Sequence, residues 1–260
     1  MEFNVAYENK RPGLIYILCD LSEKMQIVES QLQDAVKSII TSYINGCVTG
    51  TLIKNHIFIT LIGYGNGSPH ILQQGWAKDW EDTLVDVHIN NAKLIKEPLL
   101  SVQECESVWK FVGKEIFEAF EFFKNNTNYF GLASPHIINI TNRKPSNEEL
   151  CANYINEIKL LNDDYANKNP GKFFGILISS IILLDKYSNF SDVLFLRRDK
   201  SYNSKKIEFW KNIVSEVDSS FVDFIEASEP VDFEYGSHSL CCCIHDSSKC
   251  NSYALWTYYD

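Results

Sequence analysis

The feature that most constrains the fold is an uninterrupted apolar run, from Leu14 to Cys19, that ends in a carboxylate. Apolar residues in unbroken succession are typical of a strand that is buried on both faces of a parallel sheet. Asp20 and Ser22 follow the run, so their side chains are predicted to lie at a strand-to-helix turn. Because α/β proteins place their sites at the carboxyl ends of such strands, we expect a site at Asp20.

Further strands and amphipathic helices alternate along the chain. Apolar residues recur at helical spacing in four segments, residues 26–43, 100–124, 148–165 and 205–221. Apolar runs, several of them rich in β-branched or aromatic residues, predict four more strands, at residues 56–64, 70–73, 136–141 and 172–180. A tight turn before residues 70–73 predicts a hairpin. The fold class predicted is α/β: a doubly wound, mainly parallel central sheet flanked by helices, with a short antiparallel edge strand.

Composition limits the classes of function. The chain has 260 residues, 45% hydrophobic and 22% charged, which is typical of a globular protein. A net charge of −10 disfavours binding to nucleic acid or to an anionic membrane. We find no secretory signal and no apolar run that approaches a membrane span, and therefore expect a cytoplasmic protein. We predict one domain over residues 1–221 and a C-terminal extension over 222–260.

The cysteines are predicted to be reduced. Some of them, such as Cys19, lie inside expected core elements, where thiols pack as small hydrophobic groups. Near the C-terminus, Cys241, Cys243 and His245 alternate, and Cys250 follows, which is enough soft ligand for zinc. No Cys-x-x-Cys spacing is present, and alternate residues also share one face of any buried strand. Both a zinc site and a buried strand therefore remain open.

The stretch Asp-Leu-Ser-Glu-Lys that begins at Asp20 resembles the opening of the metal-ion-dependent adhesion site of von Willebrand factor A domains, Asp-x-Ser-x-Ser. The chain departs from that motif at Lys24, where the family has its second serine. After the strand at 136–141 the family has Thr-Asp-Gly, whereas this chain has Asn142 and Arg143 in the last two positions. The resemblance implies the family's fold with a degenerate metal site.

The resemblance covers about residues 10–220 and is nearest to one bacterial subgroup. This subgroup consists of cytoplasmic, tellurium-resistance-associated proteins. It is similar to this chain in the run Arg-Pro-Gly-Leu-Ile-Tyr that begins at Arg11 and in the run Phe-Trp-x-x-Ile-x-Ser that begins at Phe209. The resemblance implies a non-catalytic adaptor that binds a kinase, phosphatase or ATPase in a bacterial stress or defence system.

A divalent ion such as Mg²⁺ needs oxygen ligands, which the resemblance assigns to Asp20, Ser22, Ser101 and Asn142. Lys24 opposes such an ion. At ~4 Å its ammonium would pair with the Asp20 carboxylate and repel a dication. We therefore predict that no cofactor is bound, with a Mg²⁺ site as the alternative.

The predicted contact with a protein partner comprises five residues, Asp20, Ser22, Lys24, Asn142 and Arg143. Lys24 and Arg143 would recognise an acidic or phosphorylated segment directly. Two alternatives stay open, a metal-dependent binding domain and a hydrolase in which Asp20 is phosphorylated. We do not expect an enzyme, since no histidine pairs with a serine or cysteine nucleophile at a strand-to-helix turn, and no second acidic residue follows two positions after Asp20.

Overall fold

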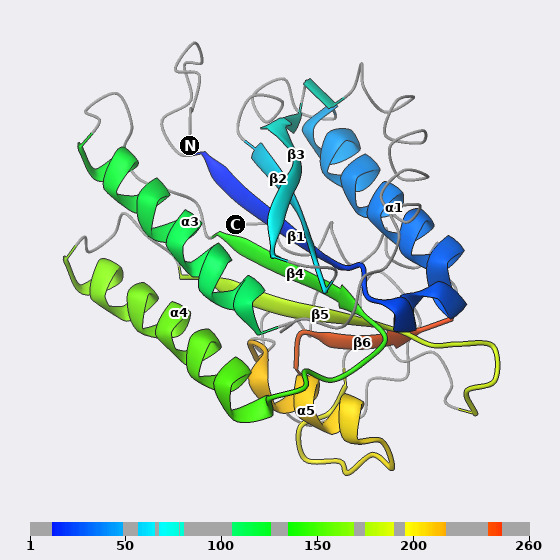
Figure 1. Ribbon diagram of the computed structural model, residues 1–260. Coiled ribbons are helices and arrows are strands. Elements are labelled where there is room, and N and C mark those ends of the chain that lie inside the picture. The colour runs from blue at the N-terminus through cyan, green and yellow to red at the C-terminus, as the bar shows by residue number, and fades with distance from the viewer. Residues whose placement is uncertain are drawn as a thin grey trace, which may run out of the picture.

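Helices cover both faces of a central sheet in the computed structural model (Figure 1). The structure describes residues 12–48, 57–65, 68–77, 79–80, 106–125, 135–168, 175–189, 196–216 and 239–245. Its elements, where η1 is a 3-10 helix, are β1 (Gly13–Asp20), η1 (Glu23–Val28), α1 (Glu29–Val48), β2 (Ile57–Tyr64), β3 (His70–Trp76), α3 (Ser107–Asn125), β4 (His136–Thr141), α4 (Glu148–Lys168), β5 (Leu177–Leu183), α5 (Lys205–Ile213) and β6 (Cys241–Ile244).

The described strands form a six-stranded sheet in the order β3-β2-β1-β4-β5-β6. β3 is antiparallel to β2, and the other neighbouring strands are parallel. This confirms the predicted α/β fold with an antiparallel edge strand. The strand order switches direction between β1 and β4, which is where open α/β sheets form a crevice at the carboxyl ends of the strands. Pairing sets Asp20 opposite Tyr64 on one side and Cys19 opposite Ile140 on the other.

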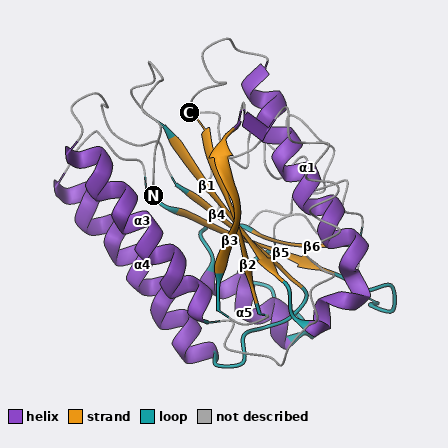
Figure 2. Cartoon of the chain, turned by 45° about the horizontal axis from the view of Figure 1, so that its top comes forward, coloured by secondary structure: helices purple, strands orange, loops and turns teal. Residues whose placement is uncertain are grey.

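Figures 1 and 2 show α1 on one face of the sheet and α3 and α4 on the other. β1, β2 and β4 are buried along their whole length, as their apolar runs predict. α5 lies near α4, and the rings of Trp109 in α3 and Trp210 in α5 are 5.9 Å apart. Among the described helices, none is long and apolar enough to cross a membrane.

The strand predicted over residues 172–180 lies further along the chain, as β5. The strand continues past Ser180, where the predicted range ends. In the structure both Ser179 and Ser180 are buried within the strand and have partners. The Ser179 hydroxyl lies 2.8 Å from His136 Nε2, and Asn139 Nδ2 donates to Ser180 Oγ at 3.1 Å. Because polar groups on β4 satisfy the two serines, β5 continues through Ser179 and Ser180.

The helix predicted over 205–221 is wrong in its second half. α5 ends at Ile213, and the chain then becomes extended. The backbone N–H of Ser215 donates to the carbonyl of Ile178 at 2.8 Å, and Glu216 pairs with Ser239 in an antiparallel bridge. At Ser215 and Glu216, pairing with strands replaces the predicted helix, and residues 217–221 lie outside the described residues.

The helix predicted over 26–43 is also longer and less regular than expected. It starts as η1, and α1 continues through Asn45 and Gly46 to Val48, although Asn-Gly is a common helix end. Part of the predicted C-terminal extension is integral to the sheet, since β6 pairs in parallel with β5. The domain boundary at residue 221 itself stays a prediction.

His136 is a fully buried histidine held between two hydroxyl groups. The Tyr43 hydroxyl lies 3.0 Å from Nδ1, and Ser179 Oγ lies 2.8 Å from Nε2. Because Ser179 Oγ donates its own proton to the carbonyl of Ile137, Nε2 must carry a proton and Nδ1 must accept from Tyr43. Burial lowers the pKa of His136 to about 3, so the ring is neutral.

This buried imidazole makes stability depend on pH. Below the ordinary histidine pKa of 6.5, the unfolded chain binds a proton that the native ring, with a pKa of about 3, does not. Stability attributable to His136 is therefore lost as pH falls from 6.5 towards 3. We predict that His136→Gln reduces the loss of unfolding free energy between pH 6.5 and 5 by about 2 kcal/mol, measured by urea denaturation. Tyr43→Phe retains the imidazole and should retain the pH dependence; equal slopes in wild type and His136→Gln would contradict the assignment.

Candidate functional site

Asp20, at the carboxyl end of β1, is fully buried and accepts hydrogen bonds at both oxygens. Thr141 Oγ1 donates to Oδ2 at 2.7 Å, and the backbone N–H of Ser22 donates to Oδ1 at 3.0 Å. Arg143 Nε donates to Oδ2 at 2.8 Å, and its Nη2 lies 3.4 Å from Oδ1. The carboxylate is thus surrounded by donors from the turn after β1, from β4 and from the loop that follows β4.

The cation beside Asp20 is Arg143, and the predicted pair between Asp20 and Lys24 is wrong. The side chain of Lys24 is exposed in the first turn of η1, and its carbonyl accepts a hydrogen bond from Asn142 Nδ2 at 2.8 Å. The Arg143 guanidinium is planar and presents several donors, so it can meet both carboxylate oxygens, which an ammonium group does less well.

Neighbouring groups hold Arg143 in this position. Trp210 Nε1 donates to the Arg143 carbonyl at 2.8 Å, and the Arg143 N–H donates to Thr141 Oγ1 at 3.1 Å. On the other side lies Gly65, with a φ of +86°. A Cβ at Gly65 would lie 2.8 Å from Asp20 Oδ1 and 3.1 Å from Arg143 Nη2. Both its φ and this close approach therefore require glycine.

Two side-chain oxygens near the ion pair have no hydrogen-bond partner within the described part of the chain: Ser22 Oγ and Asn142 Oδ1. Both residues are buried. The Asn142 carbonyl accepts from Lys206 Nζ at 2.9 Å, and burial lowers the pKa of that amine. Ser101, the fourth predicted oxygen ligand, lies outside the described residues.

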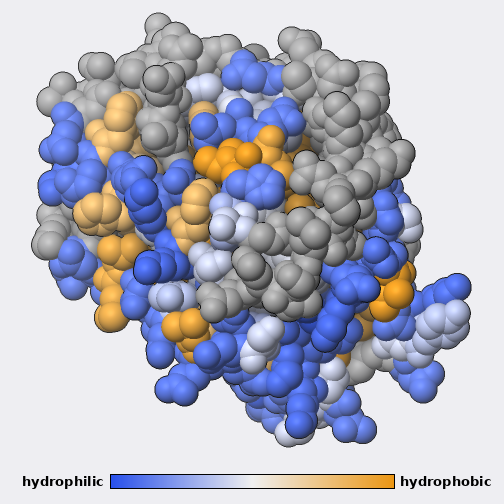
Figure 3. Space-filling model, in the orientation of Figure 1, coloured by the Kyte–Doolittle hydropathy of each residue, from blue (hydrophilic) through white to orange (hydrophobic). Residues whose placement is uncertain are grey.

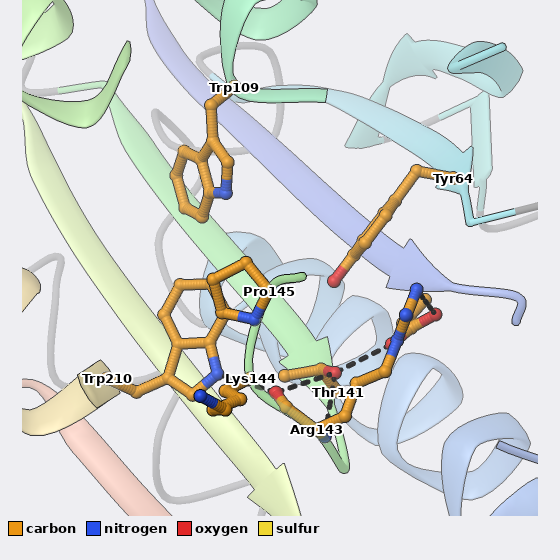
Figure 4. A pocket seen from close by; sticks show the side chains of 8 residues that line it. Tyr64, Trp109, Thr141, Arg143, Lys144, Pro145 and Trp210 are labelled. Carbon is orange, nitrogen blue, oxygen red and sulfur yellow. Dashed lines mark hydrogen bonds and ion pairs between the residues drawn. The ribbon is translucent and has the colours of Figure 1, made fainter. Parts of the chain in front are cut away.

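In the described part of the chain, side chains fill the crevice expected at the switch point. What remains is a cavity of ≈ 10 Å³, about the space of one water molecule. Figure 4 shows the side chains that line it, with the Tyr64 hydroxyl and the indoles of Trp109 and Trp210 around Pro145. Sequence analysis missed these aromatic residues as part of the site, because helical spacing indicates only that a tryptophan is buried.

A divalent ion does not fit this arrangement. Arg143 Nε lies 2.8 Å from Asp20 Oδ2 and its Nη2 lies 3.4 Å from Oδ1, and these nitrogen donors cannot themselves ligate a metal. The guanidinium of Arg143 would repel a dication at the same carboxylate. In the residues that the structure describes, no group of three or more histidine, cysteine, aspartate or glutamate side chains is arranged to hold a metal ion.

The possible zinc ligands lie at the edge of the sheet. Cys241 and Cys243 are buried within β6, as expected if the segment is a buried strand. His245 follows the strand, and its carbonyl accepts a hydrogen bond from Gln31 Nε2 at 2.8 Å. Cys250 lies outside the described residues, so zinc binding that includes Cys250 stays a prediction.

Of the five residues predicted to contact a partner, only Lys24 is exposed. Asp20, Ser22, Asn142 and Arg143 are all buried. Ile27 belongs to the apolar spacing that predicts a helix over 26–43, yet its exposed fraction is 67%. The reason is η1, because successive side chains of a 3-10 helix do not follow the α-helical spacing.

Neither protein-family models nor curated proteins match this sequence. Solved structures similar in fold match at 11–18% identity, and three of them are described here. Proximal thread matrix protein 1 from the mussel byssus has 12% identity, and the match covers 67% of this chain and 38% of that chain with a TM-score of 0.42. Manganese-loaded Plasmodium vivax TRAP protein has 14% identity, and the match covers 70% of this chain and 60% of that chain with a TM-score of 0.40. The SpRpn10 VWA domain has 18% identity, and the match covers 68% of this chain and 77% of that chain with a TM-score of 0.38. Similarity this low does not assign the chain to a family.

The geometry predicts strong coupling between Asp20 and Arg143. Removing one partner of a buried ion pair leaves an uncompensated charge, so Arg143→Ala should lower the unfolding free energy by about 3–5 kcal/mol. The Asp20→Asn/Arg143→Ala double variant should lose clearly less than the sum of the two single variants. Urea denaturation of the four proteins measures this coupling.

Lys144→Ala provides the matched control for that cycle. Lys144 pairs with Glu148 at the surface, where an ion pair contributes about 0–1 kcal/mol. A loss in Arg143→Ala as small as that in Lys144→Ala would show that the buried pair does not stabilise the site.

Proposed function

We propose that this chain is a non-catalytic, protein-binding module of the von Willebrand factor A type. The observation that carries the proposal is the filled crevice, whose remaining cavity is only ≈ 10 Å³. Pockets for small molecules are usually about 300–1,000 Å³. Because the described residues leave no such space at the switch point, binding at the surface is favoured over turnover of a small substrate there.

The state of Asp20 argues against its acting as a phosphorylated nucleophile. Its exposed fraction is 0%, and donors from Thr141, Ser22 and Arg143 occupy both oxygens. A nucleophilic carboxylate must reach the substrate with a free lone pair. This carboxylate would first have to break its ion pair.

A generic phosphate ester tests this alternative. We predict that p-nitrophenyl phosphate turnover by the wild type, with or without Mg²⁺, equals that of Asp20→Asn. Because an enzyme acting through Asp20 would lose its activity in that variant, turnover by the wild type alone would establish a hydrolase.

The surface that we propose as the contact lies at the carboxyl edge of the sheet, where η1 and the loop after β5 are neighbours (Figures 1 and 2). It comprises Lys24, Ile27, Lys186 and Tyr187, and we call it the edge surface. Ile27 is 67% exposed and Tyr187 is 80% exposed. Figure 3 shows that the face in view is mostly hydrophilic, with small separate hydrophobic areas. We propose that Ile27 and Tyr187 together form the apolar part of a partner contact.

Hydrogen bonds fix the two halves of the edge surface relative to each other. Gln31 Nε2, one turn after Ile27, donates to the carbonyl of Leu184 at 3.2 Å and to that of His245 at 2.8 Å. These bonds hold the start of α1 against the ends of β5 and β6. Lys24 and the loop that carries Tyr187 are therefore presented together.

Charge suggests the kind of segment that would bind. Arg143 and Lys144 already pair with carboxylates of this chain. Arg143 pairs with Asp20, and Lys144 pairs with Glu148. The ammonium groups of Lys24 and Lys186 are exposed, and Lys186 Nζ lies 5.0 Å from the centre of the Tyr187 ring. An acidic or phosphorylated segment with an apolar side chain complements this arrangement.

The resemblance in sequence suggests the class of partner and the compartment. We propose that the partner is a kinase, phosphatase or ATPase of a bacterial stress or defence system and that the protein acts in the cytoplasm. Cys19 and Cys151 are buried in the core and are not joined in disulfides, which is in keeping with a reducing compartment.

The edge surface can be tested with matched variants. We predict that Lys24→Glu/Ile27→Glu lowers the amount of partner cross-linked in the native host at least about tenfold, because it removes an apolar anchor and reverses a charge. Leu160→Glu changes a side chain of similar exposure, 64%, on α4 and should leave cross-linking unchanged. Equal cross-linking by wild type and Lys24→Glu/Ile27→Glu would refute the proposed surface.

A further inference from the structure

We infer that Arg143 is a cation built into a divalent-ion site, and that removing its guanidinium opens this site to a hard divalent cation such as Mn²⁺. The inference goes beyond the proposed binding function, because it concerns only the residues around Asp20. It also does not require that the partner be known.

The oxygen atoms for such a site are already present. Asp20 supplies a carboxylate, and Thr141 Oγ1 lies 2.7 Å from its Oδ2. Ser22 Oγ and Asn142 Oδ1 are buried nearby, and within the described residues neither has a hydrogen-bond partner. Buried polar atoms without partners are uncommon, since each lowers stability. Carboxylate, hydroxyl and amide oxygens are the ligands that Mg²⁺ and Mn²⁺ prefer.

The guanidinium prevents an ion from binding among these oxygens. Arg143 Nε is 2.8 Å from Asp20 Oδ2, and the Arg143 side chain is only 8% exposed. An arginine side chain stays charged at any pH at which the protein is folded. It therefore satisfies the carboxylate at all times and repels a second cation.

The guanidinium is also held in place by its surroundings. The Arg143 carbonyl accepts from Trp210 Nε1, and Gly65 lies so close that a Cβ there would be 3.1 Å from Arg143 Nη2. The side chain is consequently enclosed between α5 and the turn after β2. Only a substitution would take the charge out of the site.

Lys144, the next residue along the loop, does not occupy the ion site. Lys144 is partly exposed and pairs with Glu148, so its ammonium is directed away from Asp20. Removing Lys144 changes the net charge of the protein by the same amount as removing Arg143. The two substitutions therefore separate an effect of the site from an effect of overall charge.

The test is titration with Mn²⁺, followed by calorimetry and by the electron paramagnetic resonance signal of free Mn²⁺. We expect the wild type and Lys144→Gly to show no saturable Mn²⁺ binding. We expect Arg143→Gly to bind one Mn²⁺ with a Kd at least about tenfold below the lower limit that the titrations set for those two proteins. Asp20→Asn/Arg143→Gly should lose this gain. Arg143→Gly/Asn142→Asp, which adds a second carboxylate, should bind more tightly still.

Thermal unfolding provides a second readout. Mn²⁺ should raise the Tm of Arg143→Gly above its value in EDTA and leave the wild type unchanged, because only the variant binds the ion. If Arg143→Gly is unfolded in EDTA, recovery of its circular dichroism signal on adding Mn²⁺ reports the same event. Arg143→Gln keeps a side chain of comparable length without the charge and should bind Mn²⁺ more tightly than the wild type.

Two results would overturn the inference. One is Mn²⁺ binding by the wild type as tight as that by Arg143→Gly. The other is failure of Arg143→Gly, Arg143→Gln and Arg143→Gly/Asn142→Asp to bind Mn²⁺, whether they are folded or not. Neither result affects the cross-linking test of the edge surface, so the two proposals fail separately.

Discussion

A carboxylate that is shielded from water must be neutralised by the protein itself, and the arrangement of this site depends on how that is done for Asp20. Arg143 provides the charge, and Thr141 and Ser22 provide further donors. The ion pair joins the end of β1 to the loop after β4. Through Trp210 it also fixes α5, and through Gly65 it fixes the turn after β2. Buried ion pairs add little net stability compared with apolar packing, but they tolerate very few alternative arrangements.

The pair also helps to fill the switch point of the sheet. In open α/β sheets the switch point between strands is the usual position for a ligand. Here aromatic side chains, Pro145 and the ion pair fill it, so the cavity holds about one water molecule. Any partner must then contact what lies outside, which at this edge includes Ile27 and Tyr187. The switch point between β1 and β4 is thus packed with side chains.

Much of the fold was predictable from the sequence, because buried strands give unbroken apolar runs. β1, β2 and β4 were predicted from such runs and are buried throughout. The cation at Asp20 was not predicted, since it is 123 residues away in the chain, whereas Lys24 is close in sequence. Sequence spacing reports local neighbours, and only the pairing of β1 with β4 brings Arg143 to the carboxylate. The end of β5 was missed for the same reason, because the groups that satisfy its serines belong to β4.

Those serines have a consequence for the accuracy of folding. A strand that slips by two residues keeps its apolar side chains on the correct face, so hydrophobic patterning alone does not prevent such an error. A slipped β5 would separate Ser179 from His136 and Ser180 from Asn139, leaving several polar groups buried and unsatisfied. The two hydrogen-bonded pairs therefore favour the native register of β5 against β4 over a register shifted by two residues.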